Sequence, residues 1–351
     1  MCRHVITSFY RNLLEIDLTT ITLYYTERYK VTLKNSFGVQ KMRLVRLTAV
    51  MIFVIASAAL PATAAPKVVA SIMPVHSLAS SLMEGVGKPT LLIPSNISPH
   101  RFALKPSQRK GIADADLVFW IGHGIEGRLS KIISSKGTSA LALTKSAGLQ
   151  ILKARSGGVW GSDDGHDHHD HHGHGEHADS TKDLHIWLDP ANARLMVQAM
   201  VAALIETDKK NQALYRANGK KLLAQLKKLE GEMLRTLAPV KNKPFIVFHD
   251  AFQYFEKRFG LNGAGALMVH SGHPPSAKRL FEVRKKILQA GVNCVFREPQ
   301  FDGRLAVSVV RGTPAKIGIL DPLGSDITPG PTGYSQLMRS AAKNLSDCLK
   351  N

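Results

Sequence analysis

Cysteine is scarce in this chain of 351 residues, which contains three, and a long apolar segment is absent. The longest apolar stretch, Leu47–Leu60, is shorter than the roughly 20 residues that a transmembrane helix needs. It follows a basic segment and precedes Ala62-Thr63-Ala64, which is the pattern of a signal peptide and its cleavage site. We therefore expect a leader over residues 1–64, with the signal peptide over 42–64. Residues 1–41 form an unusually long polar lead, which indicates that translation starts at Met42.

Removal of the leader on export changes both the cysteine count and the balance of charge. Removal of the leader discards Cys2 and leaves Cys294 and Cys348, and an even pair in an oxidising compartment predicts one disulfide. Of the 46 Lys and Arg, eight lie in the leader and 38 remain, and of the 27 Asp and Glu, three lie in the leader and 24 remain. The chain without its leader is therefore basic. The basic residues are scattered along predicted helix faces without interleaved aromatic residues, so we expect no nucleic-acid partner.

Leucine, isoleucine, valine and aromatic residues are absent between Gly161 and Asp183. Such a segment has nothing to bury, and it is predicted to be a loop. It contains seven of the fifteen histidines: His166, His168, His169, His171, His172, His174 and His177. Neutral imidazole suits zinc, copper and nickel, so we expect auxiliary metal binding here. The alternative is a solubilising low-complexity linker.

Short apolar runs alternate with helical patterns along the rest of the chain. The expected buried strands are 67–71, 90–93, 116–121, 245–248, 292–296 and 316–320. This alternation predicts an α/β protein with parallel sheets flanked by helices. A leucine-rich stripe at spacings of three and four predicts one long helix over 211–239. We therefore expect an N-terminal lobe over 65–210, that rigid helix as a joint, and a C-terminal lobe over 240–351.

Polar side chains that follow predicted strands identify a candidate site. His100 comes after the second strand, while His249 and Asp321 end two later ones. Ligands of open α/β sheets bind at the carboxyl ends of strands, where these three residues are expected. His185, which comes immediately after the histidine-rich segment, is the fourth candidate. Three imidazoles with a carboxylate or water make a tetrahedral zinc site, which we expect in a cleft between the lobes.

Five motifs occur in an order that resembles a known family. They are Pro99-His100-Arg101-Phe102, His185-Ile186-Trp187-Leu188-Asp189-Pro190, Val247-Phe248-His249-Asp250-Ala251-Phe252, Cys294-Val295-Phe296-Arg297-Glu298-Pro299-Gln300-Phe301 and Leu320-Asp321-Pro322-Leu323-Gly324. Over residues 66–350 the chain is similar to the periplasmic zinc-binding proteins of bacterial ABC zinc importers, the ZnuA type.

The resemblance implies a monomeric, non-enzymatic protein in the periplasm that captures Zn²⁺ and delivers it to a permease of the inner membrane. It implies metal ligands at His100, His185 and His249. Asp321 stands at a fourth position that water fills in some zinc-binding members. Relatives that import manganese carry a carboxylate where His249 stands, so a manganese protein is the first alternative.

Two enzyme classes share some of these sequence features. Residues 122–127 fit the dinucleotide fingerprint G-x-G-x-x-G, but no Asp or Glu follows between Arg128 and Ser162 to hold a ribose. A secreted zinc hydrolase would need a general base, and the sequence has no His-Glu-x-x-His. Glu298 is the one glutamate at a strand end that we nominate for that role, although Pro299 indicates a turn.

The histidine-rich segment generates a first prediction. Ordering a flexible chain around an ion costs entropy that a preformed site avoids, so the segment should bind zinc more weakly than the cleft and hold more than one ion. Zinc titration of the intact protein should therefore give a higher stoichiometry than titration of a protein that lacks 161–182. Equal stoichiometry would leave the segment as a linker.

Overall fold

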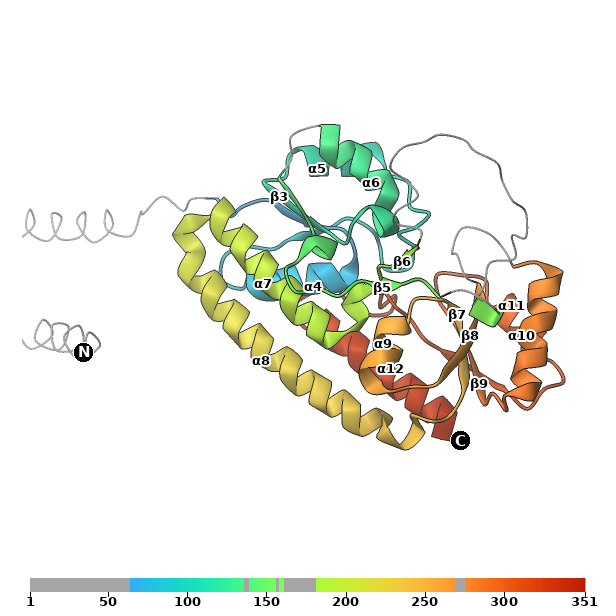
Figure 1. Cartoon of the computed structure of the whole chain (residues 1–351). Helices are drawn as coiled ribbons and strands as arrows, with labels where there is room; N and C mark the ends of the chain where they lie inside the picture. The colour runs from blue at the N-terminus through green and yellow to red at the C-terminus, as the bar shows by residue number, and fades with distance from the viewer. Residues whose placement is uncertain (1–63, 136–138, 156–157, 161–180, 269–274, 351) are drawn as a thin grey trace, which may run out of the picture. The chain divides into compact units, whose positions relative to one another are not determined.

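The computed structural model describes residues 64–135, 139–155, 158–160, 181–268 and 275–350 (Figure 1). The expected leader lies outside the described residues except for Ala64, and the histidine-rich segment lies outside them up to residue 180. Both interpretations, and the lobe boundaries, stay predictions. Within the described part of the chain, no helix is long and apolar enough to cross a membrane.

Four parallel strands in the order β2-β1-β3-β4 form the first sheet. The strands are β1 (Val68–Ala70), β2 (Thr90–Leu91), β3 (Leu117–Trp120) and β4 (Ala140–Ala142), and the helices are α4 (Met73–Leu82), α5 (Pro106–Ala113) and α6 (His123–Ser135). The central strands β1 and β3 are wholly buried, as expected for a parallel sheet covered on both faces. Gly122 of the glycine-rich fingerprint lies in the turn from β3 to α6, with φ +148°, and the rest of the fingerprint lies at the start of α6.

A second parallel sheet has the order β10-β9-β7-β8. Its strands are β7 (Phe245–His249), β8 (Gly263–Met268), β9 (Cys294–Arg297) and β10 (Lys316–Ile319), and its helices are α9 (Gln253–Phe259), α10 (Ala277–Gln289) and α11 (Arg304–Val310). The sequence analysis missed β4 and β8. In β8, Gly265 is required because a Cβ would lie 2.7 Å from the Val159 side chain, and such small residues weaken the strand pattern.

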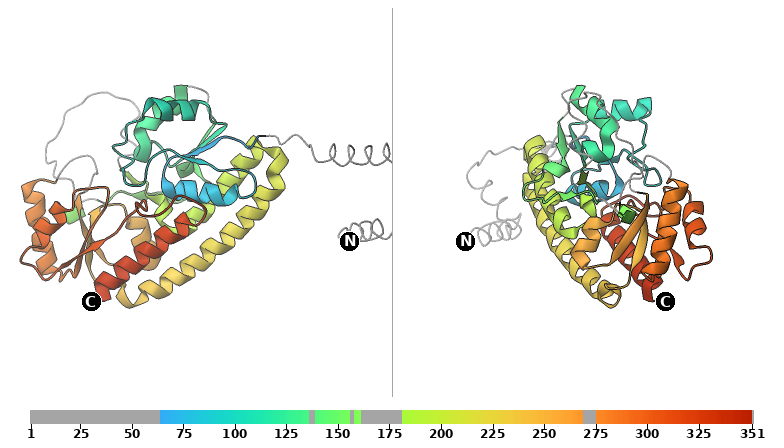
Figure 2. Two further views of the ribbon diagram at one scale, coloured as in Figure 1. Left: turned by 180° about the vertical axis from the view of Figure 1, so that it is seen from behind. Right: turned by 45° about the vertical axis from the view of Figure 1, so that its right-hand side comes forward.

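Three long helices connect and cover these sheets: α7 (Pro190–Thr207), α8 (Gln212–Leu237) and α12 (Gly333–Lys350). The expected stripe on α8 is buried, from Leu222 to Leu237. Helix α8 lies side by side with α12 (Figures 1 and 2), and α12 also packs against α4 and β10. The prediction of two parallel-sheet lobes joined by one long helix is confirmed.

Short elements lie between these units. They are the antiparallel pair β5 (Leu152–Lys153) and β6 (Lys182–Asp183), and the 3₁₀ turns η1 (Leu143–Lys145), η2 (Gly158–Trp160), η3 (Ile186–Leu188), η4 (Lys209–Asn211) and η5 (Ala238–Val240). Because β5 and β6 pair, the two ends of the segment between them lie close together.

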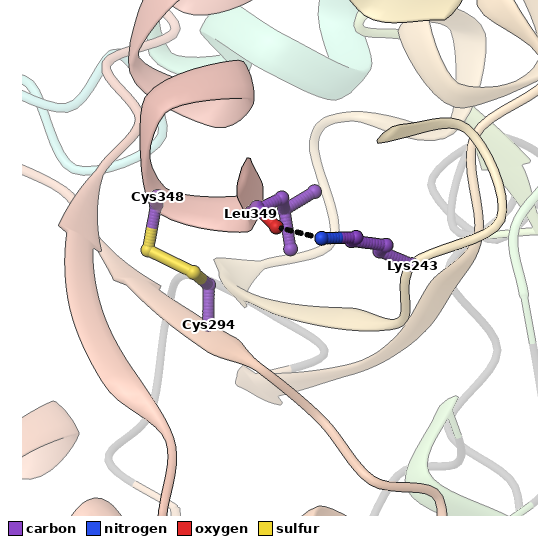
Figure 3. The surroundings of a disulfide bond; sticks show 4 residues. All are labelled: Lys243, Cys294, Cys348 and Leu349. Atoms are coloured by element: carbon purple, nitrogen blue, oxygen red, sulfur yellow. Dashed lines mark hydrogen bonds between the residues drawn. A yellow bond between two sulfur atoms is a disulfide. The ribbon is translucent and has the colours of Figure 1, made fainter. Parts of the chain in front are cut away.

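A disulfide ties α12 to the second sheet. Cys348, near the end of α12, is bonded to Cys294 at the start of β9 (Figure 3). Beside it, Lys243 Nζ donates a hydrogen bond of 2.7 Å to the carbonyl of Leu349. The disulfide predicted from the even cysteine pair is therefore confirmed, and it holds the C-terminal helix on the sheet.

Reduction of this disulfide should lower the free energy of unfolding by about 4 kcal/mol, because the bond closes a long loop in the unfolded chain. Urea denaturation with and without reductant measures the change. As the control, reductant should not affect a variant in which both cysteines are alanine. Coincident transitions of the oxidised and reduced wild type would contradict the prediction.

Candidate metal centre

Three histidines from distant parts of the sequence meet in the folded chain. The Nε2 atom of His185 lies 3.3 Å from that of His100 and 3.4 Å from that of His249. One ring nitrogen from each residue lies within 4.8 Å of the other two. A tetrahedral ion with Zn–N bonds of about 2.05 Å separates its nitrogens by about 3.3 Å. The cluster therefore has the spacing of three ligands around one ion.

The three histidines are carried by different backbone elements. His249 is the last residue of β7, at the carboxyl edge of its parallel sheet. His185 lies two residues after β6 and immediately before the turn η3, while His100 lies in a turn between β2 and α5. His185 and His249 are buried, with 8% and 5% exposure, and His100 is half-buried.

A buried carboxylate orients each of the two buried rings. Both oxygens of Glu298 lie 2.7 Å from Nδ1 of His249, and its Oε1 also accepts from the His249 backbone N–H at 3.1 Å. Asp183 Oδ1 lies 2.8 Å from Nδ1 of His185 and accepts from its backbone N–H at 3.0 Å. A carboxylate on Nδ1 fixes the tautomer that leaves Nε2 free to bind a metal, and it raises the basicity of the ring.

The two buried rings differ in their protonation. Burial, together with the charge of the neighbouring His249, lowers the pKa of His185 to about 3, so this ring is neutral. Burial also lowers the pKa of His249, but the charge and hydrogen bond of Glu298 outweigh it and raise that pKa overall. A cation bound at Nε2 would replace the second proton of the His249 imidazolium, while Nδ1–H stays hydrogen-bonded to Glu298.

Arg155 balances the acidic groups beside this centre. Its guanidinium bonds to Asp250, the neighbour of His249, with Nε 3.0 Å from both carboxylate oxygens, and it pairs with Glu256. Burial raises the pKa of Asp183 to about 7, which the His185 backbone N–H and the Arg155 charge oppose. The Arg155 charge thus opposes the protonation of Asp183 that burial favours.

Asp321 lies outside the cluster of ligand atoms. Its Oδ1 accepts hydrogen bonds from the Gln300 Nε2 at 2.8 Å and from the backbone N–H groups of Leu323 and Gly324, each at 2.9 Å. Among the described residues, the cluster contains histidines alone. Its role as a fourth ligand stays a prediction, as does metal binding by the histidine-rich segment.

Sequence reasoning missed the orienting role of the two carboxylates. Glu298 had been nominated only as a general base, and Asp183 only as the end of the histidine-rich segment. The Asp-x-His spacing of Asp183 and His185 is a usable local signal, since one carboxylate oxygen reaches both the backbone and the ring. The pairing of Glu298 with His249 spans 49 residues and has no local signal.

Two parallel-sheet lobes and a centre of three histidines define a substrate-binding protein for a metal ion. The model of the family described as "Zinc-uptake complex component A periplasmic" matches residues 68–348. The chain belongs to this family. Because these are substrate-binding proteins, the prediction that the chain is not an enzyme is confirmed.

Named relatives agree with this assignment. The chain is 42% identical over 307 residues to the high-affinity zinc uptake system protein ZnuA of Brucella abortus, covering 80% of this chain and 91% of the relative. It is 35% identical to the protein of the same name from Paracoccus denitrificans, covering 84% and 95%. A solved zinc-bound ZnuA deletion mutant has a TM-score of 0.67 at 23% identity, covering 81% of this chain and 98% of that one, and it shows the same fold.

Removal of either orienting carboxylate should weaken zinc binding by about 10- to 100-fold, because the ring loses its hydrogen-bond acceptor and its fixed tautomer. Glu298→Gln and Asp183→Asn test this by competition with a chromophoric chelator. The matched control is Glu232→Gln, which removes the same charge from the ion pair with Arg339 on α12. Wild-type affinity in both site variants would mean that the carboxylates do not support the metal.

Proposed function

We propose that this protein is the periplasmic receptor of a zinc importer, which captures Zn²⁺ through the Nε2 atoms of His100, His185 and His249. The observation that supports this most strongly is the spacing of 3.3 and 3.4 Å between Nε2 atoms whose rings are held from behind by carboxylates. Zinc is the cargo here, not a resident cofactor. The relatives called high-affinity zinc uptake system proteins support the same conclusion.

Zinc is favoured over manganese by the chemistry of the ligands. Three imidazole nitrogens suit Zn²⁺, whereas Mn²⁺ prefers carboxylate and water oxygens. Within the described residues the cluster has no carboxylate oxygen. The fold does not decide this point, because a manganese-bound protein from Pseudomonas aeruginosa has a TM-score of 0.67 at 18% identity.

The delivery of zinc to a transporter is expected of a component of a zinc-uptake complex. We infer that the chain is exported by its signal peptide, acts as a monomer in the periplasm and hands zinc to the permease of an ABC transporter in the inner membrane. The histidine-rich segment would capture additional ions at high local concentration, since its C-terminal end lies two residues before His185. A hydrolase is disfavoured, because Glu298 is engaged by His249 and is not available as a general base.

The fourth position of a tetrahedral ion is filled by Asp321 or by water. Both oxygens of Asp321 already accept hydrogen bonds, so coordination would require a shared or exchanged donor. The variant Asp321→Asn separates the two cases. A loss of zinc affinity comparable to the loss of a histidine identifies Asp321 as a ligand, and affinity within about threefold of wild type identifies water.

Replacement of a histidine ligand provides the central test. If about 10–16 kcal/mol of zinc binding is shared by four ligands, each contributes about 3 kcal/mol, or two orders of magnitude in affinity. His249→Ala in a protein lacking 161–182 should lose zinc affinity by at least that factor in calorimetry. His123→Ala, which removes a histidine bonded to Ser130 instead, serves as the control. Unchanged affinity in His249→Ala would overturn the assignment.

A further inference from the structure

The side-chain amide of Gln300 joins the two lobes beside the metal centre. Its Nε2 lies 2.9 Å from the carbonyl oxygen of Ser95, 2.8 Å from Asp321 Oδ1 and 2.9 Å from Ser325 Oγ. Ser95 belongs to the first lobe, in the segment between β2 and His100, whereas the other partners belong to the second lobe. A single amide nitrogen therefore bridges segments that are 205 residues apart.

The orientation of this amide is fixed by its partners. A backbone carbonyl and a carboxylate oxygen are both acceptors, so the NH₂ group must face them. In this orientation Gln300 Oε1 is buried without a hydrogen-bond partner in the described part of the chain. Burying an unpaired carbonyl oxygen costs free energy, so the contacts made by Nε2 must outweigh that cost.

Gln300 is connected in sequence to the residue that holds His249. Glu298, which orients His249, lies two positions earlier, and the N–H of Phe301 donates to the Glu298 carbonyl at 3.2 Å to close a tight turn. One short turn therefore has two contacts with the centre. Its first residue, Glu298, orients His249, and its third residue, Gln300, holds the segment that leads to His100.

The segment before His100 is exposed in its middle and buried at its end. Pro94 and Asn96 are exposed and Ile97 has an exposed fraction of 38%, whereas Ser98 and Pro99 are buried. Its carbonyl at Ser95 receives the Gln300 amide and, at 3.2 Å, the hydroxyl of Ser325. These two hydrogen bonds at Ser95 therefore tie the exposed part of the segment to the second lobe.

We propose that Gln300 is a positioning residue that holds the His100 segment against the second lobe and thereby sets the separation of His100 from the other two Nε2 atoms. This inference rests on the proposed zinc function. A preformed separation spares the cost of ordering His100 when the ion binds, and it imposes tetrahedral geometry on that ion. Loss of the amide leaves all three ligands present but allows His100 to move.

The test uses the exported full-length chain and the variant Gln300→Leu, which keeps the approximate size of the side chain but cannot form hydrogen bonds. Zinc affinity should fall about tenfold, and transfer of zinc to a chelator should become faster. With Co²⁺ as the probe, the visible bands of a tetrahedral site should weaken or shift. The urea unfolding of each metal-free protein is measured alongside.

Asn218→Leu is the matched control. Its amide nitrogen likewise donates to carbonyls of another element, at 3.0 Å to Leu82 and 2.9 Å to Glu84, but it lies on α8 outside the centre. We expect it to alter stability at most and to leave zinc affinity and the Co²⁺ bands unchanged. Ser325→Ala is the second, milder variant, and it should shift both readouts in the same direction as Gln300→Leu.

The outcomes separate this inference from the proposed function. If wild type binds zinc tightly, His249→Ala does not, and Gln300→Leu and Ser325→Ala both match Asn218→Leu, the positioning role is wrong and the zinc function stands. If His249→Ala binds like wild type, the proposed function itself fails. A change in unfolding alone, with unaltered Co²⁺ bands, would reduce Gln300 to a structural contact.

Discussion

The metal centre depends on hydrogen bonds between buried carboxylates and the far sides of two imidazole rings. Glu298 on His249 and Asp183 on His185 turn Nε2 of each ring toward a common point. Without such partners, a buried histidine can present either nitrogen and can rotate about its side-chain torsions. The carboxylates also supply negative charge close to the place where a cation would bind, which favours the ion over an empty site.

The fold provides the supports from which these groups act. The carboxyl edge of the second sheet carries His249 and, one strand away, Glu298 just after β9. The first lobe supplies His100, which lies in a turn after β2. It also supplies Asp183, at the end of β6, and His185, two residues later. The pairing of β5 and β6 is itself tied to the second lobe, because Tyr254 Oη accepts from the Leu152 N–H and donates to the Asp183 carbonyl, both at 2.8 Å.

Several elements hold the two lobes together. Helix α8 carries a buried apolar stripe along its length, and α12 packs beside it and is fixed to β9 by the disulfide. A continuous helix is a much stiffer joint than a Gly/Ser linker. We therefore expect the ligands on the two lobes to need little rearrangement to receive an ion, and the proposed bridge at Gln300 would act in the same sense.

The sequence by itself determined the α/β class, the long helix and the disulfide, because periodic apolar residues and an even cysteine pair are local signatures. It nominated His100 and His249 from their places after predicted strands, and His185 from its place next to the histidine-rich segment and from the resemblance to the family. It missed β4 and β8, whose small residues are explained only by what packs on them, such as Val159 on Gly265. Only the tertiary structure decided that Glu298 orients His249 and that Gln300 bridges to Ser95. Such pairs join residues 49 and 205 positions apart, and a hydrogen bond over that separation depends on how the lobes pack, which leaves no pattern in a single sequence.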